Sequence, residues 1–469
     1  MSTKARVIIV GAGLAGLAAA RCLAEQGVKV RIFDENPHPG GQLLRSIPAA
    51  SRSTGGLWDS PRRRGLALLS WLRSRGIEIL SQAQAVGSDG TGRVWVDSPR
   101  ARLQELSAEA ILLATGARET FLPFPGWTLP GVISTGGAQL LIKGSGVLPA
   151  PEMVIAGSGP LPPALAREVL QHKGRITALL DESRLIDSLG LLKLLPRQLP
   201  RLLQGLGLQA RLLRAGVFTR RQSRIVHARG DGHLAECTMA RLDSSGAPLP
   251  GSERTLRTSG LAVGWGLVPN IELGREMGCR AEFNRSKGGW VLVVNESQET
   301  SVSGIYAAGE PTGIAGGSKA LQEGEMAGLA IACSLTGRLS REDRRRWNRL
   351  RKHLKQEQDF GVFLNRLSCI PAAGYRSIPK DTTICRCEQI RLPEILASIH
   401  LGFSTVASVK KATRCGMGRC QGRTCAPILQ EILMAHPEAA QTPPTPLSVR
   451  SPVKPVALES LLEPEEGAG

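Results

Sequence analysis

A β-α-β pattern interrupted by a glycine-rich turn at the N-terminus limits the possible folds of this chain more than any other feature. The apolar run 7–10 is typical of a buried parallel strand, the Ala- and Leu-rich run 14–26 of a helix, and the alternating run 28–33 of a second strand. Residues 11–16, between the first strand and the helix, read G-A-G-L-A-G. A turn of this kind at the start of a helix indicates a dinucleotide-binding unit.

Each glycine of the first turn has a separate task. Gly11 permits the tight turn, Gly13 lets the backbone approach a pyrophosphate, and Gly16 lets the helix pack closely on the strand. The N-terminus of the helix then faces the phosphates with its partial positive charge. An acid at the end of the second strand is expected to bind a ribose, and Asp34 and Glu35 stand there. The alternative is a glycine-rich turn in an ordinary α/β unit.

A second β-α-β unit starts at residues 153–156 and repeats the turn less completely. Gly157-Ser158-Gly159 follows the strand, and a further strand over 175–180 ends in Asp181-Glu182. The third glycine position is Pro162, which a first helical turn tolerates but which loses the close packing of glycine. We therefore expect a structural remnant or a site for another nucleotide, with NAD(H) binding as the less favoured alternative.

Length, charge and aromatic content exclude several classes of protein. The 469 residues and the net charge of +19 indicate several domains and a basic surface that is solvated or meets an acidic partner, an anionic cofactor or a membrane. Aromatic residues make up only 4%, so stacking platforms and nucleic-acid binding are not expected. No apolar run approaches about 20 residues, and no signal region precedes the first strand. We therefore expect a cytoplasmic protein, with peripheral contact to the cytoplasmic face of the membrane as an option.

The ten cysteines are distributed unevenly, and the second half of them points to a metal. Five crowd into 41 residues near the C-terminus: Cys385, Cys387, Cys415, Cys420 and Cys425. In a reducing compartment such a cluster indicates a metal site rather than a disulfide framework. Four thiolates can hold a [2Fe–2S] cluster or a structural zinc ion, although zinc sites usually use C-x2–4-C pairs. The seven histidines show no metal or triad spacing, so no catalytic acid or base is assigned.

Together the N-terminal motifs resemble the two-dinucleotide-binding-domain flavoproteins, the glutathione reductase-like group. The resemblance spans about residues 5–335 and adds Pro39-Gly40-Gly41-Gln42, Ala114-Thr115-Gly116 and Tyr306-Ala307-Ala308-Gly309-Glu310 to the first glycine turn. It implies an α/β fold in which FAD is held by that turn with Asp34 and Glu35, and by Gly41, Gln42, Thr115, Gly116, Gly309 and Glu310. The group usually has Asp where Glu310 stands, which changes the reach of the carboxylate toward a ribityl hydroxyl. No C-x-x-C or C-x4-C pair occurs in residues 1–384, so disulfide reduction is not expected.

The C-terminal cysteines are similar to those of the bacterioferritin-associated-ferredoxin (BFD) type of [2Fe–2S] domain. Cys385-Arg386-Cys387 is followed, after 32 intervening residues, by Cys420-x4-Cys425. The resemblance implies that Cys385, Cys387, Cys420 and Cys425 bind the iron and that Cys415 does not. Glycines near the second pair would let backbone N–H groups reach sulfur. Residues 380–425 carry eight Lys and Arg against three Asp and Glu, which offsets the charge of a cluster.

The order of these units resembles the FAD and [2Fe–2S] α-type subunits of multi-subunit amine and amino-acid dehydrogenases. It implies six segments: 1–148 and 261–335 as two parts of the FAD-binding domain, 149–260 as the second Rossmann-like domain, 336–379 as a basic helical connector, 380–430 as the [2Fe–2S] domain and 431–469 as a Pro-rich tail. Nine Lys and Arg in 338–355 predict a solvated helix with one buried stripe, or a docking face for an acidic subunit or lipid. The tail is expected to be extended and to lie along a partner.

This resemblance implies electron transfer from an oxidised amine through a flavin and a one-electron carrier. The implied partners are a second flavin-containing catalytic subunit, a small ferredoxin-like subunit, and, as the electron sink, a respiratory acceptor. The length of the chain and the way its sequence starts favour the cyanide-forming glycine dehydrogenases within this group. The motifs themselves do not separate these enzymes from opine oxidases or from D-hydroxyproline and proline dehydrogenases. Two other classes stay open, a self-contained NAD(P)H-dependent reductase and a redox-sensing or iron-storage interaction protein.

Overall fold

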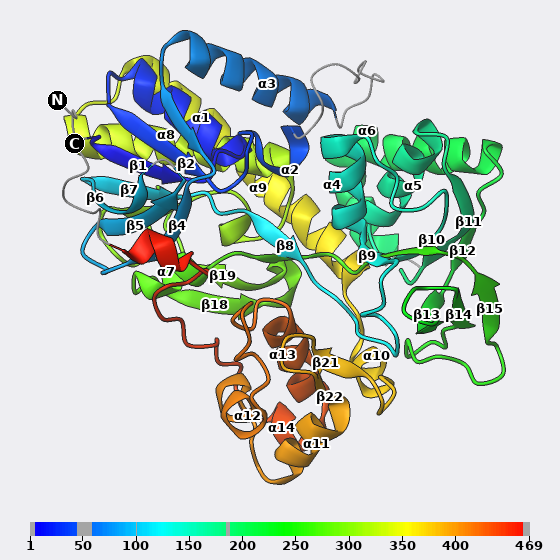
Figure 1. Cartoon of the computed structure of the whole chain (residues 1–469). Coiled ribbons are helices and arrows are strands. Elements are labelled where there is room, and N and C mark those ends of the chain that lie inside the picture. The colour runs from blue at the N-terminus through cyan, green and yellow to red at the C-terminus, as the bar shows by residue number, and fades with distance from the viewer. Residues whose placement is uncertain (1–4, 45–58, 100, 184–187, 463–469) are drawn as a thin grey trace, which may run out of the picture.

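Two parallel sheets form the centres of two α/β domains that lie side by side, and a small helical domain sits below their junction (Figure 1). The structure is a computed structural model that describes residues 5–44, 59–99, 101–183 and 188–462. The chain crosses between the two α/β domains on the antiparallel strands β8 (Ala117–Glu119) and β17 (Leu267–Pro269). The fold class that the motifs predict is therefore present.

The first α/β domain is centred on the apolar N-terminal run. Its parallel sheet has the order β20 (Ile305–Ala307), β7 (Ala110–Leu113), β1 (Val7–Val10), β2 (Val30–Asp34) and β3 (Glu78–Ser81). Helices α1 (Leu14–Glu25) and α8 (Gly317–Thr336) pack tightly together over this sheet (Figure 1). Glycines make the close approach possible, because a Cβ on Gly324 would lie 2.1 Å from the carbonyl oxygen of Ala15.

Shorter elements complete the first α/β domain. Helices α2 (Gly41–Leu44) and α3 (Asp59–Ser74) follow β2, and the antiparallel sheet β4 (Gln84–Ser88), β5 (Arg93–Ser98) and β6 (Arg102–Ser107) packs on the face opposite α1. After β17 come α7 (Glu272–Glu276) and the hairpin β18 (Ala281–Asn284) and β19 (Gly289–Leu292). The apolar side chains of β1 therefore face a core on both sides, as its unbroken hydrophobic run predicts.

The second α/β domain repeats the arrangement. Its parallel sheet has the order β12 (Thr219–Arg221), β11 (Arg175–Asp181), β10 (Glu152–Gly157), β16 (Gly260–Gly264) and β9 (Val132–Ser134). Helices α4 (Thr135–Ser145), α5 (Leu161–Gln171) and α6 (Ser188–Arg214) belong to it, as does the antiparallel sheet β13 (Ser223–Arg229), β14 (Glu236–Arg241) and β15 (Arg254–Arg257).

The limits of this second domain differ from the sequence-based boundaries. Strand β9 pairs with β16 in a register that aligns Val132 with Leu261, so both strands lie in the second sheet. The sequence predicts the first FAD-binding segment to reach residue 148 and the second to begin at residue 261. The boundaries are missed because β9 has only three residues, too few for a periodic signal, and because β16 is as apolar as a strand of the first sheet.

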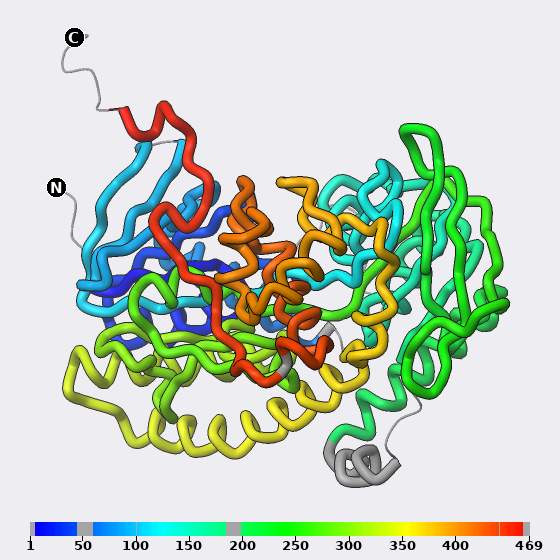
Figure 2. The backbone as a smooth tube through the Cα atoms, turned by 90° about the horizontal axis from the view of Figure 1, so that it is seen from below, coloured from blue at the N-terminus to red at the C-terminus, as the bar shows by residue number. Residues whose placement is uncertain are grey.

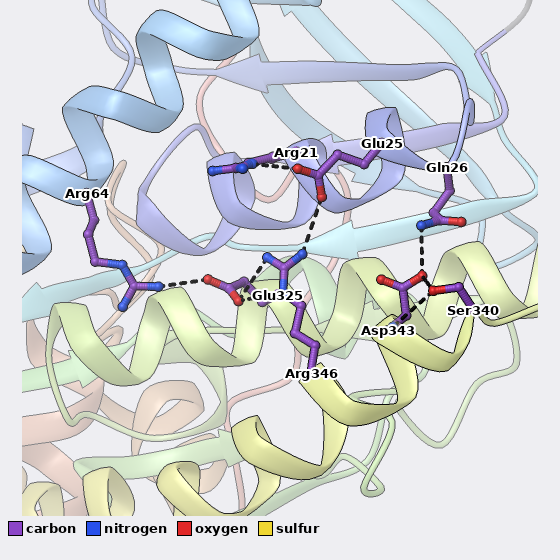
Figure 3. Close-up of polar contacts among 8 residues, drawn as sticks. All are labelled: Arg21, Glu25, Gln26, Arg64, Glu325, Ser340, Asp343 and Arg346. Atoms are coloured by element: carbon purple, nitrogen blue, oxygen red, sulfur yellow. Dashed lines mark hydrogen bonds and ion pairs between the residues drawn. The ribbon is translucent and has the colours of Figure 1, made fainter.

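The basic connector forms one long helix, α9 (Arg341–Ser368), followed by the short α10 (Ala372–Arg376). Leu354 and Phe360 of α9 are buried, whereas most of its cations are exposed. Arg346 is an exception, because it pairs with Glu25 of α1 at 3.3 Å and with Glu325 of α8 at 3.0 Å (Figure 3). Arg64 of α3 pairs with the same Glu325 at 2.9 Å. One face of the helix is thus fixed to the FAD-binding domain.

The small helical domain contains β21 (Thr383–Cys385), β22 (Ile390–Arg391), α11 (Leu392–His400), α12 (Val406–Thr413), α13 (Cys425–Ala435) and α14 (Pro437–Ala440). Its core is continuous with that of the second α/β domain. Trp127 joins the two, since its Nε1–H donates to the carbonyl oxygen of Thr383 at 2.7 Å. Arg386 lies over the same ring, 5.3 Å from its centroid.

The C-terminal tail lies along the chain's own FAD-binding domain rather than standing away from it. Figure 2 shows it leaving the helical domain and running toward β5 and β6, where η3 (Leu458–Leu461) follows. Val453 is fully buried under β4 and β5. Within the described ranges, no helix has the length and apolar composition that crossing a bilayer requires.

Candidate cofactor sites

The first glycine turn has the geometry of a phosphate cradle. Gly11 has a φ of +106°, and a Cβ there would lie 2.3 Å from the carbonyl oxygen of Ala114 in the neighbouring strand turn. A Cβ on Gly16 would lie 2.0 Å from the carbonyl oxygen of Gly11. Gly13 caps α1 without a side-chain hydrogen bond, and no atom lies within 4 Å of where its Cβ would be. The first N–H groups of α1 therefore face open space that suits an anion.

The two acids after β2 have different roles. Asp34 is buried, and its carboxylate accepts hydrogen bonds from the backbone N–H of Ala12 at 2.7 Å and from both the backbone and side-chain N–H groups of Asn36. Asp34 thus holds the glycine turn in place. Glu35 is exposed and pairs with Lys454 of the C-terminal tail. Both acids stay predicted ribose ligands, because Glu35 is exposed and the Asp34 carboxylate, with three hydrogen bonds, keeps acceptor capacity.

The remaining residues of the FAD motif are spread over three loops. Gly41 touches the first turn, because its Cβ would lie 3.0 Å from the Cα of Gly13, while Gln42 is exposed in α2. Thr115 exchanges hydrogen bonds with Asn270 across the crossing strands, its hydroxyl donating at 2.6 Å. Gly116, with a φ of +70°, continues that turn. Thr115 therefore fixes the junction between the two α/β domains.

Glu310 has a carboxylate oxygen that this chain leaves without a partner. Its Oε1 accepts from the backbone N–H of Gly316 at 2.9 Å, whereas Oε2 is buried with no hydrogen-bond partner in the described part of the chain. Burial raises the pKa of this carboxyl above its ordinary value, and Lys319 opposes the shift. An orphaned acceptor beside the second FAD loop fits a ribityl hydroxyl, so this chain's residues fit FAD at both ends of the site.

Sequence reasoning missed the residues that hold the Glu310 loop. Lys319 and Glu323 form a buried ion pair at 2.9 Å on α8. The Lys319 ammonium also donates to the carbonyl oxygens of Gly309 at 2.7 Å and Gly313 at 2.8 Å, and Glu323 accepts from the Gly309 N–H at 2.8 Å. The only available signal is the i,i+4 spacing of the two charges inside a small-residue helix, which by itself also suits a solvated pair.

The five C-terminal cysteines gather around two adjoining loops. The sulfur atoms of Cys385, Cys415 and Cys425 all lie within 4.8 Å of one another and are buried. Cys387 and Cys420 lie close enough for their thiols to interact, and Cys387 is exposed. The backbone N–H groups of Gly416 and Glu388 lie near the sulfur of Cys385, and those of Gly422 and Thr424 lie near the sulfur of Cys420.

This donor set fits an iron–sulfur cluster. Thiolates held by backbone N–H groups are the ligands that such clusters use. The glycines bring the loops together, because a Cβ on Gly418 would lie 2.2 Å from the Cβ of Cys387. The structure places Cys415 beside two of the four sequence-based ligands, Cys385 and Cys425, while the other two stand together. The set of Cys385, Cys387, Cys420 and Cys425 stays a prediction.

A positively charged cavity of about 480 Å³ separates the cluster loop from β17, β18 and β19. Seven cationic side chains line it: Arg118, Arg275, Arg285, Lys410, Lys411, Arg423 and Arg450. Arg118 of β8 bridges the two walls, since its Nε–H donates to the carbonyl oxygen of Arg423 at 3.0 Å while its guanidinium pairs with Glu272. The lining also holds the acids Glu272 and Glu431, and the net positive charge that remains would offset the negative charge of a bound cluster.

The second glycine turn is covered by the chain itself. The Ser158 hydroxyl donates to the carbonyl oxygen of Ser368 at the end of α9, at 3.0 Å. A Cβ on Gly159 would lie 2.1 Å from the Ser368 hydroxyl oxygen. The acid after β11, Glu182, is buried and bound to Arg224 and to the indole N–H of Trp265, each at 2.7 Å. The features that would hold a second dinucleotide are thus engaged in internal contacts.

Two family descriptions match successive parts of the chain. Residues 5–327 match "Pyridine nucleotide-disulphide oxidoreductase", and residues 383–435 match "BFD-like [2Fe-2S] binding domain". Among solved structures, the crystal structure of L-proline dehydrogenase from P. horikoshii has a TM-score of 0.69 at 20% identity, covering 98% of this chain and 80% of that one. This likeness confirms the fold.

Two curated relatives cover nearly the whole length. The hydrogen cyanide synthase subunit HcnB of Pseudomonas aeruginosa is 35% identical over 90% of this chain and 90% of its own. An opine oxidase subunit of Rhizobium meliloti strain 1021 is 31% identical over 97% of this chain and 99% of its own. With the FAD cradle and the clustered thiols described above, these matches show that the chain belongs to the pyridine nucleotide-disulphide oxidoreductase family, in the branch that joins an FAD-binding domain to a BFD-like [2Fe–2S] domain.

Proposed function

We propose that this chain is the FAD and [2Fe–2S] electron-transfer subunit of an amino-acid dehydrogenase complex, and that the complex oxidises glycine to hydrogen cyanide and carbon dioxide. The observation that carries the proposal is the presence of both cofactor sites in one chain whose domains are locked together. The FAD cradle lies at α1, the thiols lie at the start of α13, and Arg118 bridges the crossing strand to the cluster loop.

The two groups supply different chemistry when bound, because FAD accepts electrons in pairs and releases them singly while an iron–sulfur cluster carries one at a time. The residues of this chain position them. The α1 N-terminus would hold the pyrophosphate, and the unpartnered oxygen of Glu310 would accept a hydrogen bond from the ribityl chain. The exposed Cys387 would mark the side on which an acceptor approaches. Oxidation of glycine to hydrogen cyanide and carbon dioxide releases four electrons and four protons, so an acceptor outside this chain is required.

The relatives support a role inside a complex. Both curated relatives are named as subunits, of hydrogen cyanide synthase and of opine oxidase. We infer partners of the same kind here, namely a second flavin-containing subunit that oxidises the amino acid, a small ferredoxin-like subunit, and, beyond them, a respiratory acceptor. An opine is the alternative substrate that these relatives support, because their sequence identities to this chain are similar. D-hydroxyproline and proline stay alternatives from the sequence motifs.

A self-contained NAD(P)H-dependent reductase is the second candidate. It requires a nicotinamide nucleotide to bind at the second glycine turn. Binding of a nicotinamide nucleotide there is disfavoured, because Ser158 and Gly159 contact Ser368 and because Glu182 forms an internal ion pair. The electron-transfer role is therefore preferred.

The first test is the visible spectrum of the anaerobically purified chain, with iron and acid-labile sulfide analysis. Flavin bands with about two iron and two sulfide per chain are expected. The chain is then assayed with its co-purifying subunits and an artificial electron acceptor on glycine, an opine and D-hydroxyproline. Glycine-dependent cyanide formation supports the full proposal, and turnover of another substrate replaces glycine. Flavin with zinc and no iron would overturn the electron-transfer role.

A further inference from the structure

The C-terminal tail touches both cofactor-binding domains within four residues. Two side chains of the cluster loop hold it, since the Gln421 side-chain N–H donates to the carbonyl oxygen of Pro452 at 2.9 Å and Arg423 donates to that of Val453. The tail then crosses onto the FAD-binding domain (Figure 2). Movement of this short segment would disturb both domains at once.

Val453 anchors the tail beside the end of β2. Its side chain is 1% exposed, and its backbone N–H donates to the carbonyl oxygen of Val86 in β4 at 2.6 Å. Strand β4 begins next to the ribose-binding corner, because the N–H of Ala83 donates to the carbonyl oxygen of Asp34 at 2.9 Å. The anchor therefore fixes the tail against the corner where the adenosine end of FAD is expected.

The residue after the anchor reaches the acid at that corner. Lys454 pairs with Glu35, and the Gln84 side chain donates to the carbonyl oxygen of Pro455 at 3.2 Å. Glu35 is the exposed one of the two acids that are predicted to bind the ribose, so its side chain is held only by a partner outside the glycine turn. A residue 419 positions away in the sequence thus pairs with one of the two acids at this corner.

We propose that residues 451–455 act as a clasp on the adenosine end of the FAD site, with Lys454 as the positioning residue for Glu35. This inference rests on the FAD-binding role proposed above. The Lys454 ammonium restrains the rotamers of an exposed carboxylate and cancels the charge that it would otherwise present to the pyrophosphate. Both effects lower the cost of binding the dinucleotide, because a preorganised group loses less freedom when its ligand arrives.

The clasp also predicts that FAD and the cluster loop support each other. The same segment that meets Glu35 is held by Gln421 and Arg423, which stand between the cysteines of the cluster loop. Bound FAD should therefore keep the tail docked. The exposed Arg450–Ser451 bond offers a direct probe, because trypsin cleaves after arginine.

The test compares flavin binding to flavin-depleted full-length variants by quenching of flavin fluorescence. Lys454→Ala is expected to weaken FAD binding by about two- to fivefold, the size of a partly exposed ion pair, and deletion of residues 451–469 by about tenfold or more. Binding of FMN, which lacks the adenosine, should not change in either variant. Lys454→Arg should keep wild-type affinity, and Lys173→Ala, at an exposed lysine of the second domain, is the matched control. FAD should also slow tryptic cleavage after Arg450.

Each result has a definite meaning. Equal FAD affinity in wild type, Lys454→Ala and the deletion variant would refute the clasp while leaving the FAD role intact. An equal loss of FAD and FMN affinity would also refute it, because the effect would then not lie at the adenosine end. A wild-type chain that binds no FAD would overturn the proposed function and the clasp together. If the deletion variant does not fold, the ratio of FAD affinity to FMN affinity in Lys454→Ala, compared with wild type, tests the clasp.

Discussion

Replacing Lys319 with methionine should be far more damaging than the loss of an ordinary lysine. The Lys319 side chain is 2% exposed, and its ammonium binds Glu323, the Thr312 hydroxyl and two carbonyl oxygens of the Gly309–Gly313 loop. Methionine keeps most of the volume but none of the donors. The loop that carries Glu310 then loses the ammonium group that binds the carbonyl oxygens at both of its ends.

The size of the effect follows from burial. Lys319→Met leaves the Glu323 carboxylate, 1% exposed, without a counter-charge, and breaking a buried pair in this way costs about 3–5 kcal/mol. The double change Lys319→Met/Glu323→Gln removes both charges, and the amide oxygen can still accept from the Gly309 N–H. The carbonyl oxygens of Gly309 and Gly313 and the Thr312 hydroxyl still lose a donor, at about 0.5–1.5 kcal/mol each. The double variant should therefore lose about 1.5–4.5 kcal/mol and stay more stable than the single one, which loses the same bonds and also leaves a buried charge unpaired.

Urea unfolding of the flavin-depleted variants measures these differences. The control is Arg351→Met, which breaks an exposed pair with Glu296 and should cost less than about 1 kcal/mol. Flavin content on purification gives a second readout, because a relaxed loop should bind FAD less well. The reasoning is refuted if Lys319→Met costs no more than the control, or if the double variant is as destabilised as the single one.

Three further predictions concern the two sites and the second domain. Gly16→Ala should yield folded protein without flavin, because its Cβ would lie 2.0 Å from the Gly11 carbonyl oxygen; a wild-type ratio of FAD to protein would contradict this. The purified Cys387→Ser variant should contain no iron, whereas Cys415→Ser should keep about two iron atoms per chain. If the iron contents are the reverse, Cys415 and not Cys387 is a ligand of the cluster. NADH should leave the flavin absorbance unchanged because Ser368 covers the second glycine turn, and rapid bleaching would show that the turn is accessible.

The parts of both sites that could be predicted are written in contiguous residues. The strand, glycine turn and helix at residues 7–25 form a unit whose geometry depends on local sterics, and Gly11 and Gly16 occupy positions where a side chain would clash. The C-x-C and C-x4-C spacings likewise place thiols within reach of one another before any long-range contact forms. Local constraint is the reason that short patterns sufficed for the fold and the cofactor classes.

The rest depends on pairs that only the folded chain brings together. Nothing near Lys454 indicates that it meets Glu35, and nothing near Ser368 indicates that it closes a turn at Ser158. The i,i+4 charges of Lys319 and Glu323 read as a surface pair until the packing of α8 against α1 buries them. The sequence around Cys415 likewise does not indicate that its sulfur lies beside those of Cys385 and Cys425. Such contacts carry no periodic signal, so sequence patterns could not reveal them.

The second α/β domain is best understood as a scaffold for the cluster. Its glycine turn is occupied by the end of α9, its terminal acid by Arg224 and Trp265, and its core continues into the helical domain through Trp127. Arg118 and the tail fix the same helical domain to the FAD side. Contacts on two sides hold the helical domain, and Cys387 is exposed on it, so we expect an acceptor to approach at that edge. A fold that elsewhere binds a second dinucleotide would here set the distance between the two cofactors.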